Sequence, residues 1–305
     1  AKTDGILFAQ GLGSVRQRAD RLSALAVEIA RQTGANEAEL DYARLAGLYA
    51  KADLASGLVS ELSSLQGIVG GAYARREGMP GPVAWALETQ YDPSKNPEPA
   101  TCEGERTALR LIMADALDKL AGYLGQGKEP TGSSDPFALR RAVTILIEAA
   151  WVWPGALPAF DDLFGVALDG YAAQGIHFEP IGARRALYDI FASRYGSLLP
   201  NVRHDVLRAA LLDPASPEVT LPRSVRLRTN ALATLREDGA LVSTATRPMN
   251  LVVSAKRKGI AYGFDDPILA LDSVPLDSPE GDALAAALRD SQDPLFRAAR
   301  EEDVD

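Results

Sequence analysis

Apolar residues recur at helical spacing near the start of the chain. Four of them lie 7, 3 and 4 positions apart, in the order Val15, Leu22, Leu25 and Ile29. Because an α-helix turns once every 3.6 residues, these side chains share one face of a helix. Gly34 is typical of a helix end. Asn36, followed by Glu37 and Glu39, is typical of a helix start, and we expect that second helix to continue to about residue 57.

The same period continues through most of the chain, and no long stretch shows the period of two that marks a strand. A short apolar helix is expected at 58–65. The pair Asp135-Pro136 is a strong start signal, an N-cap followed by proline at the first helical position. The remaining helices are expected at 82–87, 103–124, 135–147, 159–173, 181–195, 202–212, 222–237, 240–257 and 280–299. The pattern therefore predicts an all-α chain.

Two segments interrupt the helical pattern and suggest how the chain is divided. Residues 126–134 are rich in Gly, Pro and Ser, and residues 259–280 are rich in Pro and Asp. Such compositions are typical of connections rather than of helices. The sequence thus predicts a helical domain at 1–126, a second helical domain at 127–258, and an acidic linker with a terminal helix at 259–305.

Composition limits the class of protein. Hydrophobic residues make up 47% of the chain and charged residues 24%, which excludes a largely disordered protein. No apolar run approaches the roughly 20 residues that cross a bilayer, and no signal peptide is present. A single cysteine excludes a disulfide framework. We expect a cytoplasmic protein, and we treat the chain, which opens without methionine, as part of a longer one.

The net charge of −9 hides a basic segment. Residues 184–258 carry 13 basic and 6 acidic side chains, between acidic segments on either side. A polyanionic partner such as RNA is therefore compatible with the sequence, although solvated helix faces are the simpler explanation. Adjacent arginines on a helix point about 100° apart, so only one of a pair usually faces a ligand. The candidate RNA-binding residues are Arg75, Arg76, Arg140, Arg141, Lys256, Arg257 and Lys258.

Common enzyme signatures are missing from the sequence. It contains no phosphate-binding glycine loop that ends in Gly-Lys-Ser/Thr and no Gly-x-Ser-x-Gly nucleophile elbow. One constellation could bind a divalent metal, namely His177 with the pair His204-Asp205, and Asp213 could add a fourth ligand. The alternative is that His204 and Asp205 lie in the first turn of a helix capped by Asn201 and face solvent.

Two long blocks of the sequence resemble a known family. Residues 51–77 read KADLASGLVSELSSLQGIVGGAYARRE, and residues 111–142 read LIMADALDKLAGYLGQGKEPTGSSDPFALRRA. They are similar to the Lys-x-Asp-Leu, Gln-Gly-x-x-Gly-x-x-Tyr-Ala and Asp-Pro-Phe-Ala-Leu-Arg-Arg-Ala motifs of the β subunit of bacterial heterotetrameric glycine–tRNA ligase. The resemblance covers most of residues 5–258, so the chain looks like a central fragment of such a subunit.

The resemblance implies a particular fold for the first part of the chain. Residues 1–126 would form a domain related to the HD phosphohydrolases, followed by a helical body. The histidines of a working HD metal site are absent from these residues, which leaves Asp53, Asp115 and Asp118. The family motif Ala-Asp-Lys-x-Asp also has Ala116 in place of its lysine. The implied domain therefore keeps the fold with a degenerate metal site.

The resemblance also implies a function. In this family ATP and Mg are used for glycine activation at the α subunit, whereas the β subunit supports tRNA(Gly) recognition and assembly. We therefore expect no catalytic residue, metal site or cofactor in this fragment, and no activity of the fragment alone. The expected partners are the α subunit and tRNA(Gly), not DNA or a membrane. Two alternatives stay open: a metal-dependent HD-type phosphohydrolase, and a non-catalytic scaffold.

Overall fold

The computed structural model describes residues 2–92, 95, 99–237 and the isolated positions 246, 250, 254, 257, 258, 283 and 286. Its α-helices are α1 (Val15–Gln32), α2 (Glu37–Tyr49), α3 (Gly57–Glu61), α4 (Ile68–Arg76), α5 (Gly81–Thr89), α6 (Glu103–Gly125), α7 (Leu139–Val152), α8 (Phe160–Ala172), α9 (Pro180–Leu198), α10 (His204–Ala210) and α11 (Pro222–Glu237). Short 3-10 turns are η1 (Lys2–Gly5), η2 (Ala52–Ala55), η3 (Ser63–Leu65) and η5 (Pro217–Thr220). The described residues include no strand, only isolated bridges, so the all-α prediction is confirmed for them.

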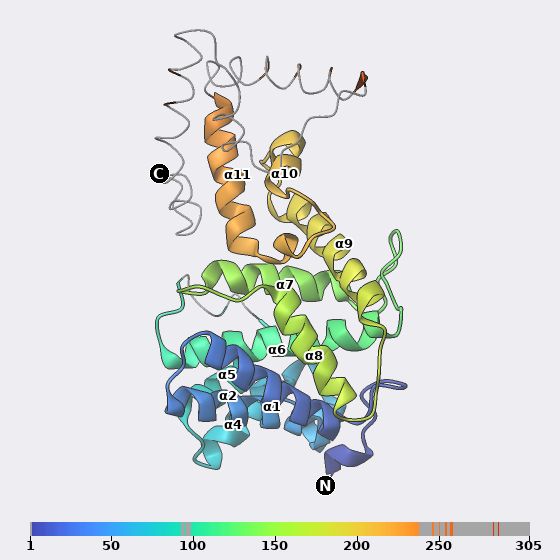
Figure 1. Cartoon of the computed structure of the whole chain (residues 1–305). Coiled ribbons are helices and arrows are strands. Elements are labelled where there is room, and N and C mark those ends of the chain that lie inside the picture. Colours follow the sequence, from blue (N-terminus) through green and yellow to red (C-terminus); the bar gives the residue numbers. More distant parts are fainter. Residues whose placement is uncertain are drawn as a thin grey trace. The chain divides into compact units, whose positions relative to one another are not determined.

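Helix α6 forms the centre of the core. It contacts α1, α2, α5, α7, α8 and α9. Figure 1 shows it crossing the middle of the lower helices, with α7 on one side and α1, α2 and α5 on the other. Leu109, Leu117 and Leu120 are fully buried, and Ile112 is nearly so. A helix with apolar residues on all sides is stable only when it is surrounded, which explains this position.

The pair α1 and α2 packs unusually closely. Both helices begin with reciprocal capping boxes, in which Ser14 pairs with Gln17 and Asn36 with Glu39. A Cβ atom on Gly47 of α2 would lie only 2.5 Å from the backbone of Ser23 in α1. Glycine at this position therefore sets the distance between the two helices.

The predicted extension of α2 to residue 57 is wrong. The helix ends at Tyr49, and the chain continues as η2 and then α3, whose N-cap is Ser56. The reason lies in two polar side chains between these elements, because Lys51 and Asp53 are both almost completely buried. Their hydrogen bonds to other segments hold the chain away from the helical path, as described below.

The predicted start of α7 is also displaced. The helix begins at Leu139 rather than at Asp135-Pro136, because Ala138 adopts a left-handed conformation with φ of 52°. Asp135 nevertheless caps the helix from a distance. Its carboxylate accepts hydrogen bonds from the backbone N–H groups of Leu139, at 2.8 Å, and Arg140, at 3.0 Å. The sequence thus identified the capping residue, and the left-handed turn displaced the helix start.

The other predicted helices up to residue 237 agree closely with the structure. The apolar stretch at 58–65 forms α3 and η3, and the expected helices at 82–87, 103–124, 159–173, 181–195, 202–212 and 222–237 correspond to α5, α6, α8, α9, α10 and α11. The helices predicted at 240–257 and 280–299 and the acidic segment 259–305 fall outside the described part, apart from isolated positions.

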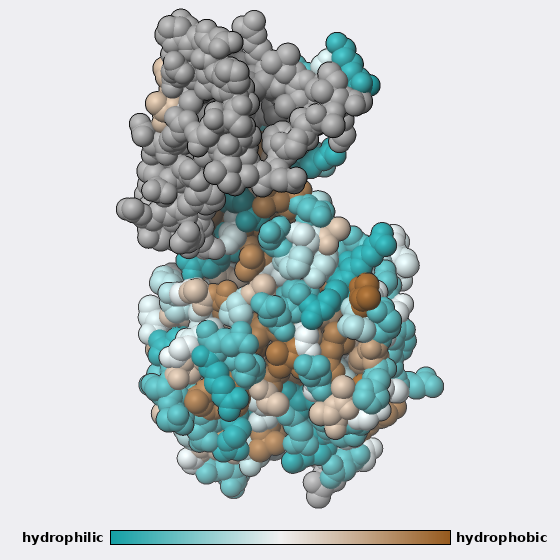
Figure 2. All heavy atoms as spheres, in the orientation of Figure 1, coloured by the Kyte–Doolittle hydropathy of each residue, from teal (hydrophilic) through white to brown (hydrophobic). Residues whose placement is uncertain are grey.

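The chain divides into two compact units at residues 225 and 226. The predicted boundary at 126–134 is the connection between α6 and α7, and both helices contribute to one hydrophobic core within the first unit. The division into domains 1–126, 127–258 and 259–305 therefore stays a prediction. Figure 2 shows hydrophilic residues over most of the visible face of this unit, with separate apolar patches among them. Among the described helices, none is long and apolar enough to cross a membrane.

Candidate ligand cavity beside a buried ion-pair network

Two arginines of α1 and two aspartates of α6 form a buried network. Arg18 donates to Asp118 at 3.1 Å and to Asp115 at 2.9 Å, and Arg21 donates to Asp118 at 2.6 Å. Arg21 also donates to Gln174 at 2.7 Å, at the end of α8. Spacings of three residues place each pair on one helix face, which is why the two faces meet. The network therefore joins α1, α6 and α8 in the interior.

Aromatic rings cover the same arginines. The guanidinium of Arg18 lies 4.0 Å from the ring centre of Phe8, and that of Arg21 lies 3.8 Å from the ring centre of Tyr171. Burial raises the pKa of the Tyr171 hydroxyl, which donates a hydrogen bond to the carbonyl of Asp118. The charges are thus enclosed by ring faces as well as by counter-ions, which lowers the free-energy cost of burying them.

Lys51 extends the network to the segment after α5. Its ammonium lies 3.0 Å from the carboxylate of Asp115 and donates hydrogen bonds to Gln90 and to the hydroxyl of Tyr91, each at 2.9 Å. Gln66 donates to the same hydroxyl. Asp53 accepts the backbone N–H of Gly67 at 2.6 Å. These contacts explain why residues 51–53 leave the helical path, because both side chains must reach inward.

The charges of this network shift one another's pKa values. Burial alone would raise the pKa of Asp115, but the nearby cations Arg18 and Lys51 outweigh it and hold that pKa at about 2. Burial lowers the pKa of Lys51 despite its contact with Asp115, and burial raises the pKa of Tyr91. The contact between these two groups at 3.0 Å favours the charged form of each of them. Asp115 is therefore ionised at neutral pH.

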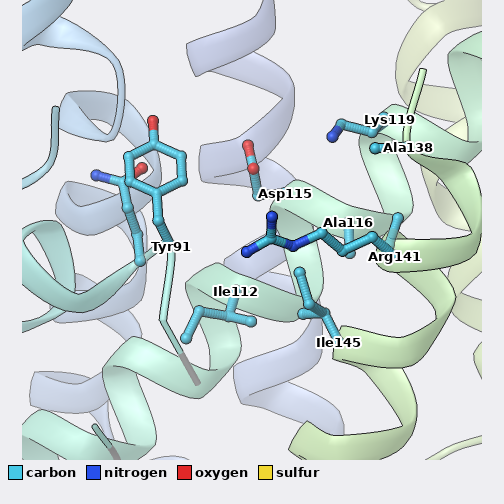
Figure 3. A pocket seen from close by; sticks show the side chains of 10 residues that line it. Tyr91, Ile112, Asp115, Ala116, Lys119, Ala138, Arg141 and Ile145 are labelled. Carbon is cyan, nitrogen blue, oxygen red and sulfur yellow. The ribbon is translucent and has the colours of Figure 1, made fainter. Parts of the chain in front are cut away.

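A cavity of about 300 Å³ opens beside Asp115. Its walls come from the end of α5, the middle of α6 and the start of α7 (Figure 3). Figure 3 shows Tyr91 on one side, Asp115 at the centre, and the side chains of Lys119 and Arg141 entering from the other side. Several apolar side chains complete the lining: Ile112, Ala116, Ala142 and Ile145. The cavity thus combines two cations, one carboxylate and an apolar wall.

Lys119 and Arg141 have no hydrogen bond or ion pair with any other described residue. Burial lowers the pKa of Lys119, and the like charges of Arg18, Lys51 and Arg141 act in the same direction against the attraction of Asp115. On α7, burial raises the pKa of Glu148, and the charge of Arg141 on the same helix opposes this shift. The cavity is therefore a place where positive charge is concentrated and not fully compensated.

The structure separates the members of each predicted arginine pair. Arg75, at the end of α4, forms an ion pair with Glu88, whereas the neighbouring Arg76 is exposed and without a hydrogen bond or ion pair in the described part. Arg140 donates to the carbonyl of Gly132 at 2.8 Å, and Arg141 faces the cavity. One member of each pair is thus free to meet a ligand.

The predicted cluster at residues 256–258 is only partly described. Arg257 and Lys258 are exposed, and Lys256 lies outside the described residues. The role of these residues in RNA binding stays a prediction.

The residues of the alternative metal site are not brought together. His177 lines a separate cavity of about 220 Å³ with Asp169 and Arg184, whereas His204 and Asp205 begin α10, where Asp205 pairs with Arg203. Within the described ranges, no group of three or more His, Cys, Asp or Glu side chains could hold a metal ion. His204 and Asp205 lie in the first turn of α10 and are exposed, as expected if they face solvent and bind no metal. The N-cap residue is Arg203 and not the predicted Asn201.

The sequence singled out the carboxylates beside this cavity and one of the two cavity cations, Arg141, but it did not indicate Lys119. Asp53, Asp115 and Asp118 all lie in or beside the network. Lys119 is a single basic residue outside any basic pair, and its local sequence gives no signal of a binding role. The sequence did give a signal for Lys51, because this residue opens the Lys-x-Asp-Leu motif, two positions before Asp53.

Comparison with known proteins identifies the family of the chain. Residues 1–212 match a family model described as glycyl-tRNA synthetase beta subunit. The glycine–tRNA ligase beta subunit of Rhodospirillum centenum is 35% identical over 290 residues, which are 93% of this chain and 38% of that protein. The corresponding subunit of Cereibacter sphaeroides is 34% identical over 311 residues, 98% of this chain and 42% of that protein. A beta subunit from a Shewanella species is 33% identical over 302 residues, 96% and 41% of the two chains.

This chain therefore spans about two fifths of the length of the curated relatives that it matches. The matched residues include α1 to α10 and hence the whole ion-pair network and the cavity beside it. On the strength of the family model and of relatives more than 30% identical over nearly all of the chain, this protein belongs to the family of glycyl-tRNA synthetase β subunits.

Proposed function

We propose that this chain is the part of a glycine–tRNA ligase β subunit that contributes to tRNA(Gly) binding and to assembly with the α subunit. Glycine activation with ATP and Mg would take place on the α subunit, in the cytoplasm. The observation that carries the proposal is the family match over residues 1–212. The cations Lys119 and Arg141 at the cavity also support it, because they would favour a phosphate-bearing partner.

We infer that Arg76 and Arg141 contribute more to tRNA binding than their neighbours. Both are exposed, and neither has a hydrogen bond or ion pair within the described residues. Arg75 and Arg140 are held by Glu88 and by the carbonyl of Gly132. An arginine that already has a partner must give it up before it can bind phosphate, so its net contribution is smaller.

A titration of the chain with tRNA(Gly) at several salt concentrations tests this proposal. If about six phosphates are neutralised, log affinity should fall with log salt at a slope of about −4 to −5. Arg76→Glu and Arg141→Glu should each weaken binding and reduce the slope by about 1. Arg31→Glu, which makes the same charge change at an exposed site on α1, serves as the control. Unchanged tRNA affinity in Arg76→Glu, Arg141→Glu and the triple reversal of Lys256, Arg257 and Lys258 would leave the chain as a scaffold.

We also infer that the first helices retain an HD-type arrangement in which protein cations take the place of metal. Arg18 and Lys51 both contact the same oxygen of Asp115, the carboxylate that the family resemblance assigns to a former metal site. Metal analysis of the purified chain tests this inference. Stoichiometric, tightly bound Fe, Mn or Zn would contradict it and would revive the phosphohydrolase alternative.

The chain alone should not activate glycine. Its family places adenylation on the other subunit, and the sequence has no recognisable nucleotide-binding loop. Glycine-dependent pyrophosphate exchange in the absence of α subunit should be at background level, and added α subunit should restore it when the complete β subunit is present. Exchange by this chain alone would overturn the assignment of adenylation.

A further inference from the structure

The cavity between α6 and α7 has a charge arrangement that the ion-pair network does not explain. Lys119 and Arg141 both enter it, as Figure 3 shows, and neither has a hydrogen bond or ion pair among the described residues. Two cations that line one cavity repel each other, and the partly buried Lys119 also loses hydration. An anion between them would supply charge-assisted hydrogen bonds to both.

Asp115 does not fill this role. Its Oδ1 atom is already bound by Arg18 and Lys51, so the positive charge of those two residues balances it inside the network. Its side chain is 16% exposed, and its Oδ2 atom accepts no hydrogen bond from the described residues. The carboxylate therefore presents a free acceptor to the cavity. A ligand that fits needs a hydrogen-bond donor as well as an anionic group.

The remaining wall favours an organic ligand over a simple ion. Ile112, Ala116 and Ile145 also line the cavity, and a volume of about 300 Å³ lies at the lower end of the range for small-molecule sites. A dianionic phosphate suits two cations better than a single carboxylate does, because each cation can bind its own oxygen.

We propose that this cavity binds a phosphate monoester that carries a hydroxyl or amino group. The phosphate lies between Lys119 and Arg141, the donor faces Asp115, and the organic part contacts the apolar wall. A free nucleoside monophosphate and the terminal nucleotide of an RNA strand share this chemistry. The proposal does not depend on the proposed function, because a free nucleotide could occupy the cavity without any binding of tRNA.

Calorimetric titration of the 305-residue chain with adenosine monophosphate, and separately with a trinucleotide that ends in a 3′ phosphate, tests the proposal. Lys119→Met and Arg141→Gln should each reduce affinity at least tenfold. Ala116→Leu should do the same by filling the cavity while the charges stay in place. Arg31→Gln removes an exposed cation of α1 that does not line the cavity, and it should leave the affinity for both ligands unchanged. Circular dichroism confirms that each variant is folded.

The outcomes separate the possible sources of the ligand. Tighter binding of the trinucleotide that requires Lys119 assigns the cavity to an RNA end, and tighter binding of the mononucleotide assigns it to a free ligand. Either result supports the proposal. Equal affinities of the wild type, Lys119→Met and Ala116→Leu for both ligands would overturn it. Loss of tRNA binding in Arg76→Glu alone would concern only the proposed function, because Arg76 does not line the cavity.

Discussion

At the scale of single residues, burial decides which ion pairs matter. Asp118 is only 1% exposed and pairs with both Arg18 and Arg21, whereas Arg16 and Asp20 form a pair in which each side chain is 45% exposed. Water screens the exposed pair, so that pair contributes little to the free energy of unfolding. The buried pair is different, because removing one partner leaves an uncompensated charge in the interior.

Asp118→Asn should therefore lower the free energy of unfolding by about 3–5 kcal/mol. The substitution removes the negative charge and leaves Arg21 without a full counter-ion. Asp20→Asn, the matched change at the exposed pair, should cost less than about 1 kcal/mol. Urea denaturation measures both. Equal losses in the two variants would show that the buried pair has no special role.

The family resemblance singled out three carboxylates as the remainder of a degenerate metal site, and it could not predict their partners. Asp53, Asp115 and Asp118 stood out through the resemblance. Arg18 and Arg21 donate hydrogen bonds to carboxylates that lie 97 or more positions away along the chain, and nothing in the local sequence indicates those contacts. Helical periodicity gives the face of each helix, and it does not give the helix that packs against that face. The cavity was unpredictable for the same reason.

At the scale of helices, the sequence was most informative where local chemistry dominates. Helices α1, α6, α8 and α11 were predicted within a few residues because their caps and apolar faces are local signals. The errors at α2 and α7 have tertiary causes. Buried hydrogen bonds of Lys51 and Asp53 end the first, and the left-handed Ala138 delays the second.

The cap of α7 gives a test at this scale. Asp135→Ala should destabilise the protein by about 1 kcal/mol, because two backbone N–H groups at the start of α7 lose their acceptor. Asp135→Asn keeps a side-chain oxygen and should cost much less. Thermal unfolding followed by circular dichroism distinguishes the two. No loss in Asp135→Ala would mean that water replaces the carboxylate without penalty.

The contact between α1 and α2 gives a second test. Gly47→Ala places a Cβ atom against the Ser23 backbone, which cannot move without separating the helices, so we expect a loss of about 1–3 kcal/mol. Gly57→Ala is the control, since a Cβ there meets nothing within 4 Å. Urea denaturation should show a near-neutral effect for the control. A neutral Gly47→Ala would contradict the close packing of the two helices.

At the scale of the whole molecule, the network links stability to acid pH. The pKa of Asp115 is about 2 in the folded protein and 3.8 is its ordinary value. Because the folded-state pKa is the lower one, the unfolded chain binds more protons between these values. The stabilisation is complete above about pH 4 and is lost as pH falls toward 2.

We therefore expect the free energy of unfolding to fall between pH 4 and 2, with Asp115 contributing part of the slope. Asp115→Asn should be less stable than the wild type at pH 5, and the difference between them should shrink as pH falls. Urea denaturation at several pH values in that range measures it. Parallel pH profiles for the two proteins would show that Asp115 does not titrate as described.

The wide separation of the network's members along the chain has a kinetic consequence. Arg18, Lys51 and Asp115 lie in three segments, so their charges stay hydrated until all three have docked. An earlier, partial closure would enclose an unpaired ion. The ion pairs should therefore form after the rate-limiting step of folding. Substitutions in the network should then speed unfolding and leave the folding rate almost unchanged, so these buried charges would lengthen the lifetime of each folded molecule.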